Sequence, residues 1–152
     1  MATAQKFALA RVQEISDHQT DAAAASLANL NRELHEQEER LMLLFKYRSE
    51  YNERLHRAAA DGLDGAAMRN YHDFLQRLES AIMQQHARVV EARTRAEHGR
   101  LEWQNRRRKS MAFDSLSKRF ELKTLRDEAV REQKTQDALA QRGARGHAKN
   151  SR

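Results

Sequence analysis

Residues 71–103 read YHDFLQRLESAIMQQHARVVEARTRAEHGRLEW, and this stretch decides the fold. Apolar or small side chains recur in it at steps of three, four or seven residues, which is the a/d pattern of a coiled coil. Gln85 and Gly99 fill the two gaps in this series. Its other members are Leu75, Leu78, Ile82, Val89, Ala92, Ala96 and Trp103. The stretch therefore predicts a helix that packs against a partner helix along one stripe.

A second apolar stripe runs along an adjoining face of the same predicted helix. It consists of Phe74, Leu78 and Ala81, which follow one another at helical spacing. The partner helix covers the first stripe, so the second is a candidate surface for binding another protein.

Residues 2–60 predict the partner helix. Their heptad seam is strong in its C-terminal half, where Gln37 and Arg48 are its polar members. The apolar members there are Leu27, Leu30, Leu34, Leu41, Leu44, Tyr51 and Leu55. Upstream, the expected seam is weaker and consists of Leu9, Val12, Ile15 and the run Ala22–Ala25.

The segment Asp61-Gly62-Leu63-Asp64-Gly65 is the clear break between the two helical patterns. Two glycines within four residues supply the permissive backbone that a turn needs, and Asp64 is a candidate N-cap for the helix that follows. The sequence therefore predicts helix, short turn, helix.

We predict an all-α fold, a long two-stranded antiparallel coiled-coil hairpin. It forms a single domain over residues 1–142, with helices at about 2–60 and 66–142, a turn at 61–65 and a disordered basic tail at 143–152. Folding about the turn places Tyr51 near Leu75, Leu44 near Ile82, and Trp103 near Ala22–Ala25. The second helix is longer and should project beyond the first. A long helix that pairs with a second chain fits the same pattern.

Beyond Trp103 the apolar spacing becomes irregular, so we expect the seam to lose its regularity there. The apolar residues of this segment are Met111, Phe113, Leu116, Phe120, Leu125 and Val130.

The composition limits which folds and functions are possible. The chain has 152 residues, no proline and no cysteine, with 39% hydrophobic and 33% charged residues. This favours an elongated helical protein over a compact domain, which needs a broader apolar core. No apolar run is long enough to span a membrane, and the N-terminus lacks the pattern of a secretory signal. The net charge of +6 favours acidic partners.

No pattern in the sequence predicts catalysis or a cofactor. The seven histidines form no pair spaced four residues apart, and the chain contains no HExxH, GxxxxGK[ST] or GxGxxG motif. The carboxylates are mixed with Lys and Arg on predicted exposed faces. We therefore expect no catalytic, metal-binding or cofactor-binding residue, and a protein that is not an enzyme.

The basic block Arg106–Lys109 has three interpretations. It can be a solvated helix face with acidic neighbours, a phosphate-binding surface for nucleic acid, or a segment that docks into an acidic protein cavity. Aromatic residues are not interleaved with it, which disfavours base stacking and hence nucleic acid as a partner.

The aromatic residues on either side of the turn are better candidates for binding. A two-helix seam cannot cover every large side chain, so some rings near the turn should be exposed. Tyr51 and Leu78 fit the seam itself. Tyr47 and Phe74 lie off it and predict an exposed patch for a partner.

Residues 41–51, LMLLFKYRSEY, and 70–82, NYHDFLQRLESAI, resemble the FliJ family of flagellar type III export proteins. Trp103, the glycine-containing turn near residue 62 and the segment EQKTQD at 132–137 agree with this resemblance, which covers nearly the whole chain. The most specific part is the pair of tyrosine-containing strings on the two sides of the turn.

The resemblance implies a cytoplasmic antiparallel coiled coil that is similar to the central stalk of rotary ATPases. Such a stalk sits in the pore of the hexameric export ATPase ring, touches the cytoplasmic domain of the membrane export gate and escorts export chaperones. It implies a location at the cytoplasmic face of the inner membrane, with indirect membrane association and no nucleic acid partner. A stalk of a virulence type III secretion system and a basic nucleic-acid-associated coiled coil are the alternatives.

The resemblance also implies which residues make contact. The helix ends Ala2–Asp17 and Phe120–Arg142 would enter the ATPase ring. The ring-binding candidates are Phe7, Leu9, Arg11, Phe120, Leu125, Arg126 and Arg131. The gate-binding candidates are Leu44, Tyr47, Tyr51, Phe74, Leu78 and Ala81.

Overall fold

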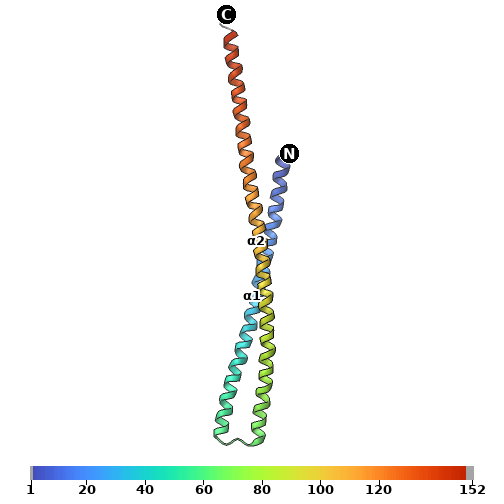
Figure 1. The fold of residues 1–152 in the computed structure, drawn as a ribbon, viewed down its shortest axis with the longest axis vertical. Coiled ribbons are helices and arrows are strands. Elements are labelled where there is room, and N and C mark those ends of the chain that lie inside the picture. The colour runs from blue at the N-terminus through green and yellow to red at the C-terminus, as the bar shows by residue number, and fades with distance from the viewer. Residues whose placement is uncertain (1, 150–152) are drawn as a thin grey trace. The chain divides into compact units, whose positions relative to one another are not determined.

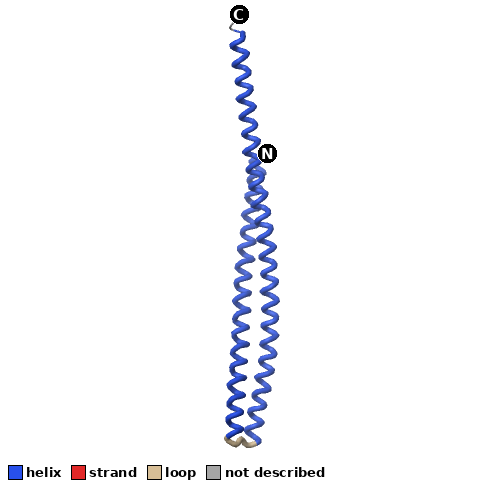
Figure 2. The backbone as a smooth tube through the Cα atoms, turned by 60° about the vertical axis from the view of Figure 1, so that its left-hand side comes forward, coloured by secondary structure: helices blue, strands red, loops and turns tan. Residues whose placement is uncertain are grey.

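The structure, a computed structural model, describes residues 2–149, with the side chains of residues 3–145. It contains helix α1 (Ala2–Ala60) and helix α2 (Gly65–Lys149), which pack against each other as an antiparallel hairpin (Figures 1 and 2). The predicted all-α coiled-coil hairpin is confirmed. The chain divides into a turn unit, Asp21–Asn105, and a terminal unit, Met1–Thr20 with Arg106–Arg152.

The turn between the helices is built from the residues that predicted it. Gly62 adopts a φ of 89°, a left-handed conformation that glycine takes without steric cost. The Asp64 carboxylate accepts a hydrogen bond from the Ala67 N–H at 2.7 Å and caps α2. Helix α2 begins at Gly65, one residue before the predicted start.

The turn unit contains every buried apolar side chain of the described residues. These are Leu78, Ile82, Val89, Ala92 and Ala96 of α2, all of them members of the predicted seam. The seam also contains a polar layer, in which the Gln85 side-chain amide donates to the Gln37 backbone oxygen at 3.0 Å and to its side-chain oxygen at 2.8 Å. Gln85 is buried, so these bonds satisfy a group that would otherwise lose its water.

The register of the turn unit agrees with the predicted pairing. The ring of Tyr51 stacks on Phe74, with a centroid distance of 3.9 Å, and Phe74 is the neighbour of its predicted partner Leu75. At the other end of the unit, Gly99 lies against α1. A Cβ atom at Gly99 would lie 2.6 Å from Leu30 Cδ1, so glycine permits this close approach of the helices.

In the terminal unit the predicted seam of α1 is wrong at two positions. Val12 is 39% exposed and Ile15 is 51% exposed. The least exposed side chains here are Leu9, which was predicted, and Gln13, Ser16 and Thr20, which were not. These residues continue the spacing of three and four residues that the seam has in the turn unit. The register therefore continues, although three of the four residues that occupy it are polar.

The same correction applies to α2 beyond Trp103, where we expected an irregular seam. The less exposed side chains remain regularly spaced and are Arg106, Ser110, Phe113, Ser117, Phe120 and Thr124. The apolar residues Met111, Leu116, Leu125 and Val130 are 60%, 48%, 61% and 52% exposed. Of the apolar residues named for this segment, Phe113 and Phe120 occupy seam positions and the others lie beside the seam.

Helix α2 projects beyond the N-terminus of α1, as predicted (Figure 1). The side chains from Leu125 to Arg145 are all exposed. The helix continues to Lys149, whereas a tail was predicted from residue 143. Each glycine costs a helix only about 1 kcal/mol, and the two in this segment, Gly143 and Gly146, stand among the good helix formers Ala, Arg and Lys. Residues 150–152 of the predicted tail lie outside the described residues.

Candidate functional site

The turn unit carries an aromatic patch, which we define as Tyr47, Tyr51 and Phe74. Tyr51 is half-buried and stacks on Phe74. The centroids of the Tyr51 and Tyr71 rings lie 5.8 Å apart. Tyr47 is 46% exposed and Phe74 is 40% exposed. The exposures agree with the expectation that these two rings, both off the strict seam, offer apolar surface to solvent.

The remaining gate-binding candidates lie deeper in the turn unit. Leu78 is only 7% exposed, and Leu44 and Ala81 are half-buried. Leu78 therefore holds the helices together beneath the patch and has little surface to offer a partner. The structure brings the six candidates to one part of the turn unit, and their contact with a gate stays a prediction.

Heptad geometry explains why Tyr47 and Phe74 share a side of the hairpin. Each precedes a seam position, Arg48 in α1 and Leu75 in α2, by one residue. Equivalent flanking positions face each other across an antiparallel pair, so the two rings lie on the same side of the seam. The guanidinium of Arg54 lies 5.8 Å from the centroid of the Tyr51 ring and gives the patch a positive edge.

Two exposed apolar residues beside the patch were missed by the sequence analysis. Met42 is 66% exposed and Leu43 is 47% exposed, and both line a shallow hollow on α1 together with Glu39 and Lys46. Leu43 precedes Tyr47 by one helical turn, so helical spacing could have identified it. The exposed apolar surface of α1 beside the patch therefore includes Met42 and Leu43 as well as Tyr47.

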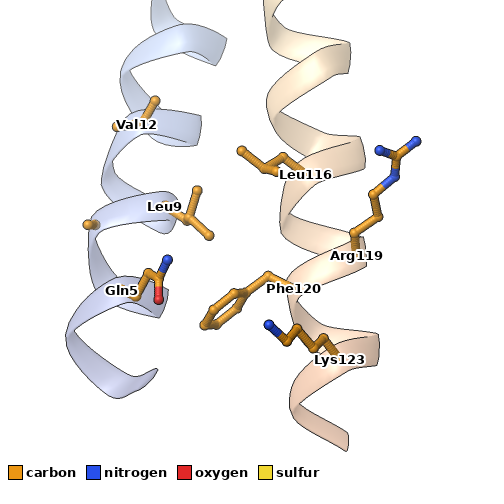
Figure 3. Close-up of a pocket in the computed structure, with 8 residues that line it drawn as sticks. Gln5, Leu9, Val12, Leu116, Arg119, Phe120 and Lys123 are labelled. Carbon is orange, nitrogen blue, oxygen red and sulfur yellow. The ribbon is translucent and has the colours of Figure 1, made fainter. Parts of the chain in front are cut away.

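The terminal unit brings two of the ring-binding candidates together. Leu9 of α1 and Phe120 of α2 line an open cleft of about 390 Å³ between the two helices (Figure 3). The other lining residues are Gln5, Ala8, Val12, Leu116, Arg119 and Lys123. Val12 and Lys123 lie within the helix ends predicted to enter the ring but were not among the named candidates, although each follows a candidate by three residues. Arg119 lies just outside those ends.

The other ring-binding candidates do not line this cleft. Phe7 is 74% exposed and Leu125 is 61% exposed. Leu125 shares a second hollow of the terminal unit with Phe120, where Lys6 and Glu128 also lie. The exposed arginines of this candidate set are Arg11, Arg126 and Arg131.

The basic block is anchored at one end. The Arg106 guanidinium donates to the Gln19 side-chain oxygen at 2.8 Å, and this arginine is half-buried in the seam. One turn further on, the Ser110 hydroxyl donates to the Asp17 carboxylate at 2.6 Å. The block is therefore partly a structural element, while Arg107, Arg108 and Lys109 are exposed.

Comparison with known protein families shows what this chain is similar to. The family described as "Flagellar FliJ protein" matches residues 5–149. The chain belongs to the FliJ family. The FliJ proteins of Salmonella typhi and Escherichia coli (strain K12) are each 28% identical to it over 141 residues. These residues cover 93% of this chain and 96% of each relative.

The match to the FliJ family spans both the aromatic patch and the cleft, because it includes Leu9, Tyr47, Phe74 and Phe120. The suspected family resemblance is thus confirmed over nearly the whole chain. No helix within residues 2–149 is long and apolar enough to cross a membrane.

Two exposed ion pairs of this FliJ family member keep their groups charged. A hydrogen bond from Arg100 lowers the pKa of the Glu97 carboxyl, and a hydrogen bond to Asp114 raises the pKa of the Lys118 ammonium. Both shifts favour the charged form, whereas a general acid or base needs its pKa near the working pH. Among the described residues, no group of three or more His, Asp or Glu side chains is arranged to hold a metal ion.

Proposed function

We propose that this chain is the non-enzymatic stalk and adaptor of the flagellar type III export apparatus. Membership of the FliJ family makes it a flagellar export component. The finer proposal is that the terminal unit binds the hexameric export ATPase and that the turn unit binds the cytoplasmic domain of the export gate. On this view the protein works in the cytoplasm, at the inner face of the membrane, without a cofactor.

The observation that carries this proposal is the presence of exposed apolar surface in both units of a hairpin with a thin core. Phe74 and Tyr47 are solvent-accessible in the turn unit, and Phe7, Leu116 and Leu125 are solvent-accessible in the terminal unit. Exposed large apolar residues that cluster in this way are typical of protein-binding surfaces. Helix α2 contributes to both surfaces and connects them through one continuous backbone.

The mechanical role follows from the two-helix construction. A pair of helices joined by interdigitating side chains resists bending more than one helix does, so movement of one bound partner can be transmitted to the other. The net charge of +6 would complement acidic groups on the partners and speed their association. We also propose that the exposed surface of α2 binds export chaperones.

The gate contact is tested with Phe74→Ala. Phe74 stacks on Tyr51 and is 40% exposed, so the substitution removes exposed ring surface and leaves the buried seam residues in place. Met83→Ala is the matched control, because Met83 is an exposed residue of the same helix and unit but lies outside the patch. We expect Phe74→Ala to weaken capture by the gate's cytoplasmic domain about tenfold or more, and Met83→Ala to leave it unchanged.

The helical content of both variants, measured by circular dichroism, should equal that of the unchanged chain. Capture of Phe74→Ala at full strength would contradict the assignment of the patch to the gate.

The ring contact is tested with a chain that ends after Arg119. It lacks Phe120 and the projecting part of α2, and we expect it not to stimulate the ATPase. Full stimulation by the shortened chain would contradict that assignment.

A further inference from the structure

The cleft in the terminal unit is an apolar cavity that the chain itself leaves open. Leu9 points toward α2, and Leu116 and Phe120 point toward α1, yet the three side chains do not close the space between the helices (Figure 3). Carbon atoms form nearly all of its wall. At about 390 Å³ it falls in the size range of cavities that accept ligands.

The cleft exists because the seam around it is built from small and polar residues. Ser117 occupies the seam position before Phe120, and Gln13 occupies the position after Leu9. Neither side chain supplies the apolar volume that a leucine or isoleucine would place between the helices. In the turn unit the equivalent positions hold Ile82 and Val89, which are buried. Where the turn unit has small seam residues, Ala92 and Ala96 are buried nonetheless, and Gly99 lies against Leu30 and Leu27.

The cleft has basic residues at its edge. Lys123 of α2 reaches toward α1 at this edge, whereas Arg119 lines the cleft with its stem and points its guanidinium away from α1 (Figure 3). Both side chains are exposed, so Arg119 can turn toward a bound carboxylate. The surrounding part of α2, residues 106–123, holds seven basic residues and two acidic ones. An apolar wall under a basic rim is complementary to a segment that carries a large apolar side chain next to carboxylates.

We propose that this cleft seats one large apolar side chain from an acidic segment of the export ATPase ring, with Arg119 and Lys123 facing carboxylates of that segment. The inference rests on the proposed function and identifies the contact that makes the terminal unit bind. The exposed Leu116 and Val12 would become buried when the side chain enters. Arg119 and Lys123 make the contact dependent on salt, because exposed charge pairs are screened.

Two variants test the two parts of the contact. Leu9→Trp fills the cleft from within, and the double change Arg119→Glu, Lys123→Glu reverses the rim without altering the apolar wall. The matched controls are Met83→Trp and Arg88→Glu, at exposed positions of α2 in the turn unit, outside both the cleft and the segments predicted to enter the ring. Binding of the full-length chains to the purified ATPase hexamer is measured by calorimetry at low and moderate salt, and helical content is measured alongside.

We expect Leu9→Trp to weaken binding about ten- to a hundredfold, which corresponds to the loss of one buried large side chain. The rim variant should lose most of its affinity at low salt and no longer respond to salt, while both controls bind as the unchanged chain does. If Leu9→Trp and the rim variant both bind the hexamer as tightly as the unchanged chain, the cleft proposal is overturned. The proposed ring contact itself would still stand.

An unchanged chain that does not bind the hexamer would overturn the proposed ring contact, and the cleft proposal with it. The unbound chain is also examined by sedimentation. A dimer that disappears on Leu9→Trp would show that a second copy fills the cleft, and this too would overturn the proposal.

Discussion

Ile82→Ala tests whether the buried stripe of the turn unit holds the hairpin together. Ile82 is 6% exposed and lies between Leu78 and Val89 in the buried series of α2. The adjacent residue Met83 is 72% exposed, so Met83→Ala removes a side chain of similar size from the same turn of the same helix. The two changes differ mainly in which side of the helix loses carbon atoms.

The magnitude follows from the atoms removed. Ile→Ala deletes three carbon atoms, worth about 0.8 kcal/mol each when buried, and leaves a cavity that the neighbours fill only in part. A seam between two helices is open to water at both flanks, so we expect a value near the lower end of the usual range, about 2–3 kcal/mol. Met83→Ala should change the free energy of unfolding by no more than about 0.5 kcal/mol.

The assay is urea unfolding followed by the fluorescence of Trp103, the chain's one tryptophan. Trp103 is half-buried in the turn unit and therefore reports on this unit. Circular dichroism in parallel shows whether the helices outside it unfold in the same transition. A loss below about 1 kcal/mol for Ile82→Ala, or an equal loss for Met83→Ala, would refute the assigned seam.

Three further predictions concern the turn and the polar layer, and each is measured by the same unfolding assay. Gly62→Ala should destabilise the hairpin by about 1 kcal/mol because its φ is 89°, whereas Gly65→Ala, in a helix with open space around it, should be neutral or slightly stabilising; equal effects would contradict the assigned turn. Asp64→Ala should cost about 1 kcal/mol through loss of the cap on α2, and an unchanged stability would show that the cap contributes nothing. Gln37→Leu with Gln85→Leu should leave the stability equal or higher but allow other pairings, seen as dimers in sedimentation; a strictly monomeric double variant would show that the polar layer does not select the pairing.

The fold could be predicted from the sequence because several signals agreed. The proline-free heptads indicated two long helices, and Gly62 with Asp64 located the turn between them. Once the turn was placed, the register followed, since facing residues in a hairpin lie at equal distances from it. The stacking of Tyr51 on Phe74 agrees with this register to within one residue.

The terminal unit was predicted less well because apolar residues were used to trace the seam. A coiled coil keeps its spacing along each helix, so the strong register around Leu27 continues backward to Ser16 and Gln13 although both are polar. Val12 and Ile15 are then displaced to the side of the seam and remain exposed. Counting in heptads from the well-packed half would have identified the correct residues.

The two candidate surfaces also differed in how far they could be predicted from the sequence. The exposure of Phe74 could be predicted, because a large ring beside a thin seam has little to cover it. The cleft at Phe120 could not, because it depends on how completely small residues on two helices fill a shared space. The spacing of apolar residues in the sequence does not determine how much of that space stays empty.

The central claim is that one chain holds the export ATPase and the export gate at the same time. The most direct test immobilises the gate's cytoplasmic domain and measures how much ATPase hexamer it retains in the presence and absence of this chain. We predict retention that requires the chain and is lost with Phe74→Ala. Release of the chain from the gate domain when the hexamer is added would mean that the two partners compete for it, and would contradict the account.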